Sequence, residues 1–199
     1  MLKLFIFDMG GVMIRDFHIA PALFKFLNLK VKSFKELGSE VEEALKEHSR
    51  GNISEEEFWK FFNEHTSLNV DYTKESLLGK FFTPVLDLPT VEVVKDLKSK
   101  GYRVVCGTNV IDAHYCIHEK LRQYDVFEAV YPSHKLHIAK PDSAFYLEIC
   151  KREKVSPQEA FFTDDLAENV EKAKSVGLTG CVYHDALQLK DELIGLKAL

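Results

Sequence analysis

Residues 3–12 read KLFIFDMGGV, and this stretch decides the fold. The apolar run from Leu4 to Phe7 is typical of a strand buried on both faces, and it ends in the carboxylate of Asp8. Gly10 and Gly11 follow, and glycine lets a backbone curl close to a ligand and turn amide groups toward an anion. Ligands of open α/β proteins bind outside the carboxyl ends of parallel strands, which predicts such a site at Asp8. On this stretch alone, a buried strand that ends in an ordinary Asx turn is an equal alternative.

The second half of the chain alternates short apolar runs with helical patterns. Strands are predicted at 3–7, 102–106, 127–131, 160–163 and 180–183, and helices at 111–123, 143–153 and 167–176. This rhythm indicates an α/β fold with a Rossmann-like parallel sheet and helices on both faces.

The segment between residues 14 and 86 has a different texture, with no convincing strand. Apolar residues recur at helical spacing, as at Phe58, Phe61 and Phe62, and Ser54 with Glu57 matches a capping box. We therefore predict a small all-helical cap at 14–86, inserted after the first strand of a core domain formed by 1–13 and 87–199. Such an insertion would cover Asp8 as a lid. The alternative is that these helices complete one all-round core.

Composition narrows the possible partners. The chain has 199 residues, of which 46% are apolar and 29% charged, and its formal charge of −5 gives no general attraction to nucleic acid or to an anionic membrane. No signal peptide precedes the first strand pattern, and no apolar run reaches membrane-spanning length. The four cysteines form no CxxC pair and are expected to be reduced residues in or near the core. We expect a cytoplasmic protein with no nucleic-acid or membrane partner.

Four polar segments end predicted strands or lie in loops that should reach the same edge of the sheet. They are Asp8 with Gly10 and Gly11, then Thr108-Asn109, then Lys140-Pro141, and finally Asp164-Asp165. Carboxylates gathered at one edge repel one another unless a cation lies among them, and oxygen ligands suit Mg²⁺. Lys140 and the Thr108 hydroxyl would bind phosphate oxygens, and Asp8 would be placed as a nucleophile. Taken singly, each segment has a simpler explanation, such as a helix N-cap for the Asp-Asp pair.

The ordered set resembles the haloacid dehalogenase superfamily. The resemblance lies in FIFDMGGV at 5–12, VVCGTN at 104–109, KPDSAFY at 140–146 and FFTDDLAENV at 161–170, and it spans nearly the whole chain. The helical insertion and RGNISEEEF at 50–58 look like the small-helical-cap branch, which includes bacterial α-glucose-1-phosphate phosphatases.

The resemblance implies roles for individual residues. Asp8 would be the nucleophile and a Mg²⁺ ligand, together with Asp164, Asp165 and the backbone carbonyl of Gly10. Thr108 and Lys140 would act in catalysis by binding phosphate. We expect four residues to bind the substrate: Gly10, Thr108, Asn109 and Lys140.

One position departs from the family pattern. Phosphatases of the family usually carry a second aspartate two residues after the nucleophile, which serves as acid and base, and this chain has Gly10 there. An acid would have to come from elsewhere, for example from His18 in the cap, or from solvent. A sugar 1-phosphate needs less help from an acid because its leaving group is better.

The predicted function is that of a Mg²⁺-dependent phosphatase that hydrolyses a small phosphorylated metabolite, expected to be a sugar phosphate, through an aspartyl-phosphate intermediate. The alternatives are a 2-haloacid dehalogenase-type hydrolase and a non-catalytic phosphate-binding protein. Asn169 either orients a metal ligand or faces solvent, and the sequence does not decide between these two roles. His134 and His137 are expected to be solvated more often than functional, and Trp59 to belong to the cap core.

Overall fold

A single parallel sheet forms the centre of the larger lobe of the molecule. The structure is a computed structural model that describes all residues 1–199. The sheet order is β5-β4-β1-β6-β7, from strands β1 (Leu4–Phe7), β4 (Arg103–Thr108), β5 (Val130–Pro132), β6 (Ala160–Asp164) and β7 (Thr179–Val182). In the central strand, Leu4 lies between Arg103 of β4 and Ala160 of β6. The predicted parallel α/β sheet is confirmed.

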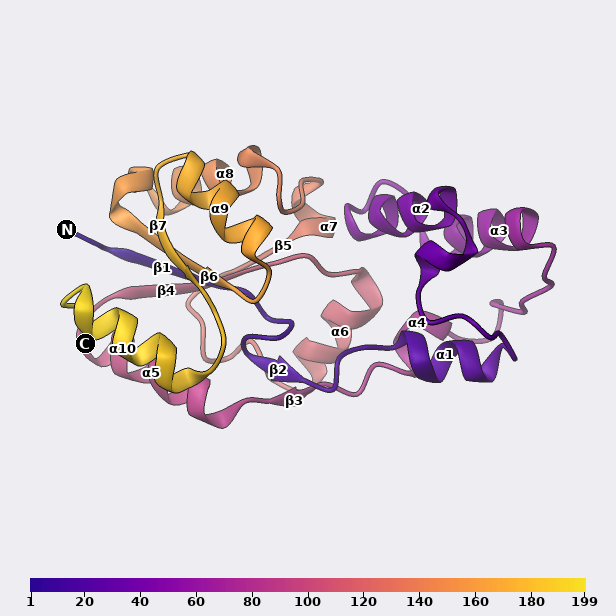
Figure 1. Cartoon of the computed structure of the whole chain (residues 1–199), viewed down its shortest axis with the longest axis horizontal. Coiled ribbons are helices and arrows are strands. Elements are labelled where there is room, and N and C mark those ends of the chain that lie inside the picture. The colour runs from indigo at the N-terminus through magenta and orange to yellow at the C-terminus, as the bar shows by residue number, and fades with distance from the viewer.

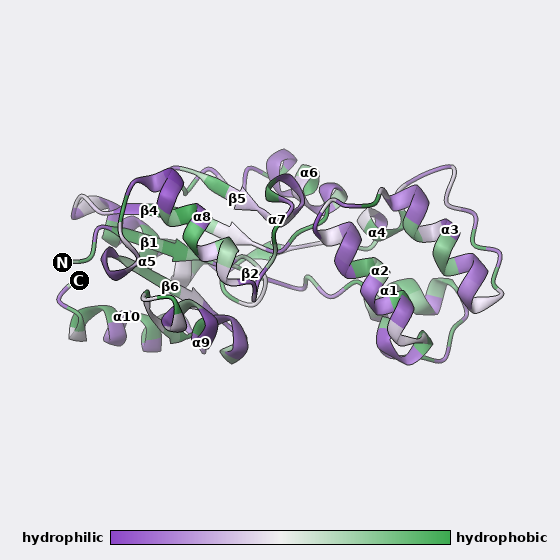
Figure 2. Cartoon of the chain, turned by 90° about the horizontal axis from the view of Figure 1, so that it is seen from above, coloured by the Kyte–Doolittle hydropathy of each residue, from purple (hydrophilic) through white to green (hydrophobic).

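Helices cover both faces of this sheet. Helices α5 (Leu88–Ser99) and α10 (Ala186–Gly195) cover one face, and α8 (Ser143–Glu153) and α9 (Ala167–Ser175) cover the other (Figure 1). Because successive strand residues point to opposite faces, Phe5 and Phe7 pack in the first hydrophobic cluster and Leu4 and Ile6 in the second. Figure 2 shows the resulting green strands between helices whose outer faces are largely purple.

A helical cap forms the smaller lobe, which lies at the end of the molecule opposite the two termini (Figure 1). It contains α1 (Ala20–Phe26), a 3-10 helix (Phe34–Leu37), α2 (Ser39–Ser49), α3 (Glu55–Thr66) and α4 (Leu77–Lys80). The cap has its own hydrophobic cluster, centred on Phe58, Trp59 and Phe62. The Ser54–Glu57 capping box begins α3 as the sequence predicts.

Two short strands correct the prediction of a strand-free segment. β2 (Ile14–Arg15) pairs antiparallel with β3 (Val85–Leu86), so a two-stranded ribbon joins the cap to the core. Two residues are too few for an alternating pattern, and the pairing joins segments some seventy residues apart, so no local signal predicts it. The boundaries 14 and 86 stay a proposal, which this ribbon supports.

Three smaller features also differ from the sequence prediction. The strand predicted at 127–131 begins at Val130, because Phe127 belongs to a turn in which its amide donates to the carbonyl of Tyr124. Phe127 is apolar because it packs against the core beside that turn. Helix α6 (Asp112–Lys120) is shorter than predicted, and Cys116 on it is exposed, outside the core.

No helix of the structure combines the length and the apolar character needed to span a membrane.

Candidate active site

The carboxyl edge of the sheet gathers three carboxylates and one ammonium group. Asp8, Asp164 and Asp165 each offer an oxygen within 4.8 Å of the others. The Nζ atom of Lys140 lies 2.7 Å from Asp8 Oδ1 and 2.6 Å from Asp164 Oδ2. The segments predicted to converge therefore do so.

Adjacent strands place the acidic residues. Asp8 follows β1 directly and its amide donates to the carbonyl of Thr163 in β6. Asp164 is the last residue of β6 and is fully buried. Its side chain accepts hydrogen bonds from the amide of Leu166 at 2.9 Å and from Nδ2 of Asn169 at 3.0 Å. Asn169, which the sequence left open, therefore orients Asp164.

Lys140 reaches the site from a loop and not from the end of a strand. This loop follows the short helix α7 (Ser133–Leu136), and the side chain of Lys140 is buried. Asn109, next to Thr108 at the end of β4, fixes the loop: its Nδ2 donates to the Lys140 carbonyl and its Oδ1 accepts from the Lys140 amide, each at 2.9 Å. The amide of Asn109 thus positions Lys140, although Asn109 also lines the cavity described below.

The charges at this edge do not balance. Three carboxylates face one ammonium group. Burial raises the pKa of Asp8 to about 7, with a further contribution from Asp164, although Lys140 opposes the shift. Burial and the Asp164 carboxylate likewise raise the pKa of Asp165. Burial disfavours the charge of Lys140, yet Asp8 and Asp164 together raise the pKa of this ammonium group.

This donor set fits a divalent cation such as Mg²⁺. Oxygen ligands with uncompensated negative charge are what Mg²⁺ prefers, and it keeps part of its water shell for substrate phosphate. The residues that could hold it are Asp8, Asp164 and Asp165, with the carbonyl of Gly10, which accepts no hydrogen bond from within the chain.

The two glycines after Asp8 differ in how strictly their positions require glycine. Gly11 has a φ of +74°, and a Cβ there would lie 2.2 Å from Asp165 Oδ2, so this position needs glycine. Gly10 is not in the left-handed region, and a Cβ there would meet the ring of Phe17 at 3.2 Å. Arg15 holds the turn by donating from Nη1 to the carbonyls of Gly11, Val12 and Ile14.

A cavity of about 330 Å³ opens over this edge between core and cap. Its lining contains all the predicted site residues except Asp164, which lies buried beneath it: Asp8, Gly10, Thr108, Asn109, Lys140 and Asp165. Phe17, Phe82, His114 and His118 also line it and were not predicted there, because nothing near them in the sequence marks a site. His18 is present as expected for a cap residue. His134 and His137 lie outside this lining.

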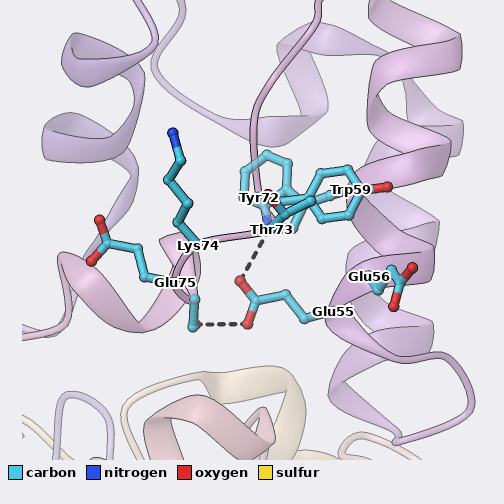
Figure 3. Close-up of a pocket in the computed structure, with 8 residues that line it drawn as sticks. Glu55, Glu56, Trp59, Tyr72, Thr73, Lys74 and Glu75 are labelled. Carbon is cyan, nitrogen blue, oxygen red and sulfur yellow. Dashed lines mark hydrogen bonds between the residues drawn. The ribbon is translucent and has the colours of Figure 1, made fainter.

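A second cavity, of about 430 Å³, lies within the cap and away from the carboxylates of the candidate active site (Figure 3). Glu55 lines it and accepts hydrogen bonds from Trp59 Nε1 at 3.0 Å and from Ser76 Oγ at 2.6 Å. It also accepts from the amide of Leu78. Because these bonds tie α3 to the start of α4, Glu55 has a structural role.

Comparisons with known proteins agree with this geometry. The sesquiterpene phosphatase AstK of Aspergillus oryzae is 28% identical over 96% of this chain and 94% of its own length. Flavin mononucleotide hydrolase 1 of Arabidopsis thaliana is 26% identical over 98% of this chain and 78% of its own. Among solved structures, the magnesium complex of a HAD family enzyme from Bacteroides thetaiotaomicron superposes with a TM-score of 0.74 at 21% identity, covering 95% of this chain and 98% of that one.

A family model for haloacid dehalogenase-like hydrolases matches residues 2–177, which is most of the chain. The ordered motifs, the parallel sheet and the carboxylate cluster at its edge agree with that match. This chain belongs to the haloacid dehalogenase-like hydrolase family.

Proposed function

We propose that this protein is a Mg²⁺-dependent phosphatase of a small phosphorylated metabolite, with Asp8 as the nucleophile. The observation that carries the proposal is the placement of the Asp8 carboxylate on a cavity wall, 2.7 Å from Lys140 Nζ and next to the Asp164-Asp165 pair. A carboxylate at such a place can form an aspartyl-phosphate.

The reaction proceeds in two displacements at phosphorus. A carboxylate oxygen of Asp8 forms a bond to phosphorus, and the ester P–O bond breaks, so the alcohol leaves with a proton taken from solvent or from an acid in the cavity. Water then attacks the acyl phosphate, releasing inorganic phosphate and restoring Asp8. Lys140 and Thr108 bind the phosphoryl oxygens, and a bound Mg²⁺ would offset their negative charge.

The relatives support phosphate ester hydrolysis. Two of them are named for the removal of phosphate from a sesquiterpene compound and for the hydrolysis of flavin mononucleotide. The Bacteroides enzyme was also solved in complex with magnesium and inorganic phosphate. The sugar phosphate expected from the sequence stays a prediction, which the substrate panel tests.

The test is phosphate release from a panel of phosphate monoesters that includes p-nitrophenyl phosphate, with Mg²⁺ and with excess chelator. We expect release only with Mg²⁺, and we expect Asp8→Asn to lower kcat by at least about a thousandfold while leaving the fold intact. Activity that survives exhaustive chelation would contradict the metal assignment. An Asp8→Asn variant with more than about a tenth of the wild-type rate would remove Asp8 from the nucleophile role.

The same preparation separates the two alternatives. Halide release from a 2-haloacid would indicate a dehalogenase, a reaction that the negative charge of Asp164 and Asp165 disfavours because the substrate is itself a carboxylate. Binding of inorganic phosphate without turnover of any ester would indicate a non-catalytic phosphate-binding protein.

A further inference from the structure

An apolar hollow of about 370 Å³ adjoins the catalytic cavity. Five residues line both spaces: Phe17, His18, Asn109, Val110 and His114. The first holds the charged groups, whereas 8 of the 13 residues that line the second are hydrophobic. A substrate whose phosphate lies at Asp8 therefore has an apolar space beside its other end.

Both lobes contribute apolar side chains to this hollow. Phe34, Leu45 and Leu78 come from the cap, and Val110 and Ile111 come from the loop after β4 in the core. Phe34, Leu78, Val110 and Ile111 are buried, and Leu45 is half-buried. These walls are thus set by the packing of the cap against the core.

The polar groups at the junction of the two spaces are already engaged. The amide of Asn109 makes both its hydrogen bonds to the backbone of Lys140. His114 forms a hydrogen bond through Nε2 with the carbonyl of Leu78 at 3.0 Å. Recognition of a sugar needs several donors and acceptors aimed at its hydroxyls, because a polar group buried without a partner is costly.

Three further polar residues line the hollow, and they are too few to surround a sugar. Lys46 is exposed and lies near the carboxylates of Glu42 and Glu43. The Ser49 hydroxyl lies 3.5 Å from that of Ser133. The side chain of His18 is exposed.

We propose that the substrate is a phosphate monoester of an apolar organic alcohol, whose hydrocarbon group occupies this hollow. The inference rests on the proposed phosphatase function and adds the substrate class. Each methylene group removed from water into such a wall raises kcat/KM about fourfold. Selectivity then comes from burial of the hydrocarbon, with Phe34, Leu45 and Ile111 as the walls.

The test is a series of n-alkyl monophosphates from ethyl to octyl, with glucose 1-phosphate and glucose 6-phosphate as polar comparisons. Alkyl leaving groups in this series have nearly the same reactivity, so chain length isolates binding in the hollow. We expect kcat/KM to rise about fourfold per methylene until the hollow is filled, and octyl phosphate to exceed both glucose phosphates. A flat series, or a preference for a glucose phosphate, overturns the inference while leaving the phosphatase proposal standing. No release from any ester, p-nitrophenyl phosphate included, overturns both.

A pair of cap variants links the effect to the hollow. Leu45→Gln should lower the octyl-to-ethyl ratio of kcat/KM about tenfold. Phe26→Gln, on the exposed outer side of α1 in the same cap, should leave the ratio unchanged. If Leu45→Gln fails to fold, Ala20→Phe, which narrows the hollow from α1, gives the same comparison. An unchanged ratio in a folded wall variant contradicts the assignment.

Discussion

The neighbouring residues Asp164 and Asp165 differ in burial and in hydrogen bonding. Asp164 is fully buried and accepts hydrogen bonds from Lys140, Leu166 and Asn169, whereas Asp165 is exposed and forms no ion pair. The family resemblance implies that both aspartates are metal ligands. The structure adds that Asp164 also holds the buried Lys140 in place.

Alanine variants of the two aspartates should therefore differ in their effects on Mg²⁺ binding and on the free energy of unfolding. Asp165→Ala should weaken Mg²⁺ binding and activity while leaving the free energy of unfolding nearly unchanged. Asp164→Ala should lower that free energy by about 3–5 kcal/mol, because it removes one partner of a buried ion pair. Mg²⁺ titration by calorimetry and urea unfolding measure the two effects. Equal stability losses in both variants would contradict this division.

At Gly10, a side chain is sterically possible. Gly10→Asp needs only a shift of a few tenths of an ångström in the ring of Phe17, since Gly10 is outside the left-handed region. The new carboxyl would supply an acid, so hydrolysis of alkyl phosphates should rise relative to that of p-nitrophenyl phosphate, whose leaving group needs no acid; such help is typically worth about 10²–10⁴-fold. The measurement is the ratio of the two rates in wild type and variant.

A matched substitution one residue later serves as the control. Gly11→Ala should lose activity on every ester, because its Cβ would collide with Asp165 and its φ of +74° is strained for alanine. An unchanged rate ratio in a folded Gly10→Asp variant would show that the wild-type protein already has an acid in the cavity, with His18 as the candidate to test next.

At the scale of elements, the sequence predicts what depends on local patterns. Strands β1 and β6 are buried on both faces and appear as apolar runs, and α3 is marked by its capping box. The ribbon of β2 and β3 was missed because two-residue strands leave no pattern. Lys140 was predicted in the site from its motif, but its support by Asn109 depends on a contact between residues 31 positions apart.

Within the cap, a single side chain joins two helices. Glu55→Ala would leave Trp59 Nε1, Ser76 Oγ and the Leu78 amide without their acceptor, so we expect a loss of about 1–3 kcal/mol in the stability of the cap. Trp59 is the single tryptophan of the chain, so its fluorescence during urea unfolding reports on the cap.

The neighbouring glutamate provides the control for this prediction. Glu56→Ala removes the same charge from the first turn of α3 but no hydrogen bond to another side chain. It should change the midpoint of the Trp59 transition much less than Glu55→Ala does. Equal midpoints for the two variants would mean that the Glu55 contacts do not stabilise the cap.

At the scale of the whole molecule, several contacts besides the ribbon join the cap to the core, and two of them involve residues that line the hollow. Ser133 Oγ, at the start of α7, donates to the carbonyl of Ser49 at the end of α2. On the other side, His114 of α6 forms a hydrogen bond with the Leu78 carbonyl of α4 and stacks on Phe82 at 3.7 Å between ring centroids. These contacts set the width of the space in which the substrate must fit.

The His114 contact should make the stability of the molecule sensitive to acid. Burial lowers the pKa of His114 to about 4, whereas an unfolded histidine has a pKa near 6.5, so the unfolded state binds the additional proton between these values. The contribution is present above about pH 6.5 and is lost as the pH falls toward 4, amounting to about 2 kcal/mol between pH 7 and pH 5. His114→Gln can still donate to the Leu78 carbonyl but does not titrate, so its free energy of unfolding should fall by about 2 kcal/mol less than that of wild type over the same interval. Urea unfolding of both proteins at pH 7 and pH 5 measures this difference. Parallel losses in the two proteins would place the acid sensitivity in other groups and leave the contact between cap and core independent of pH.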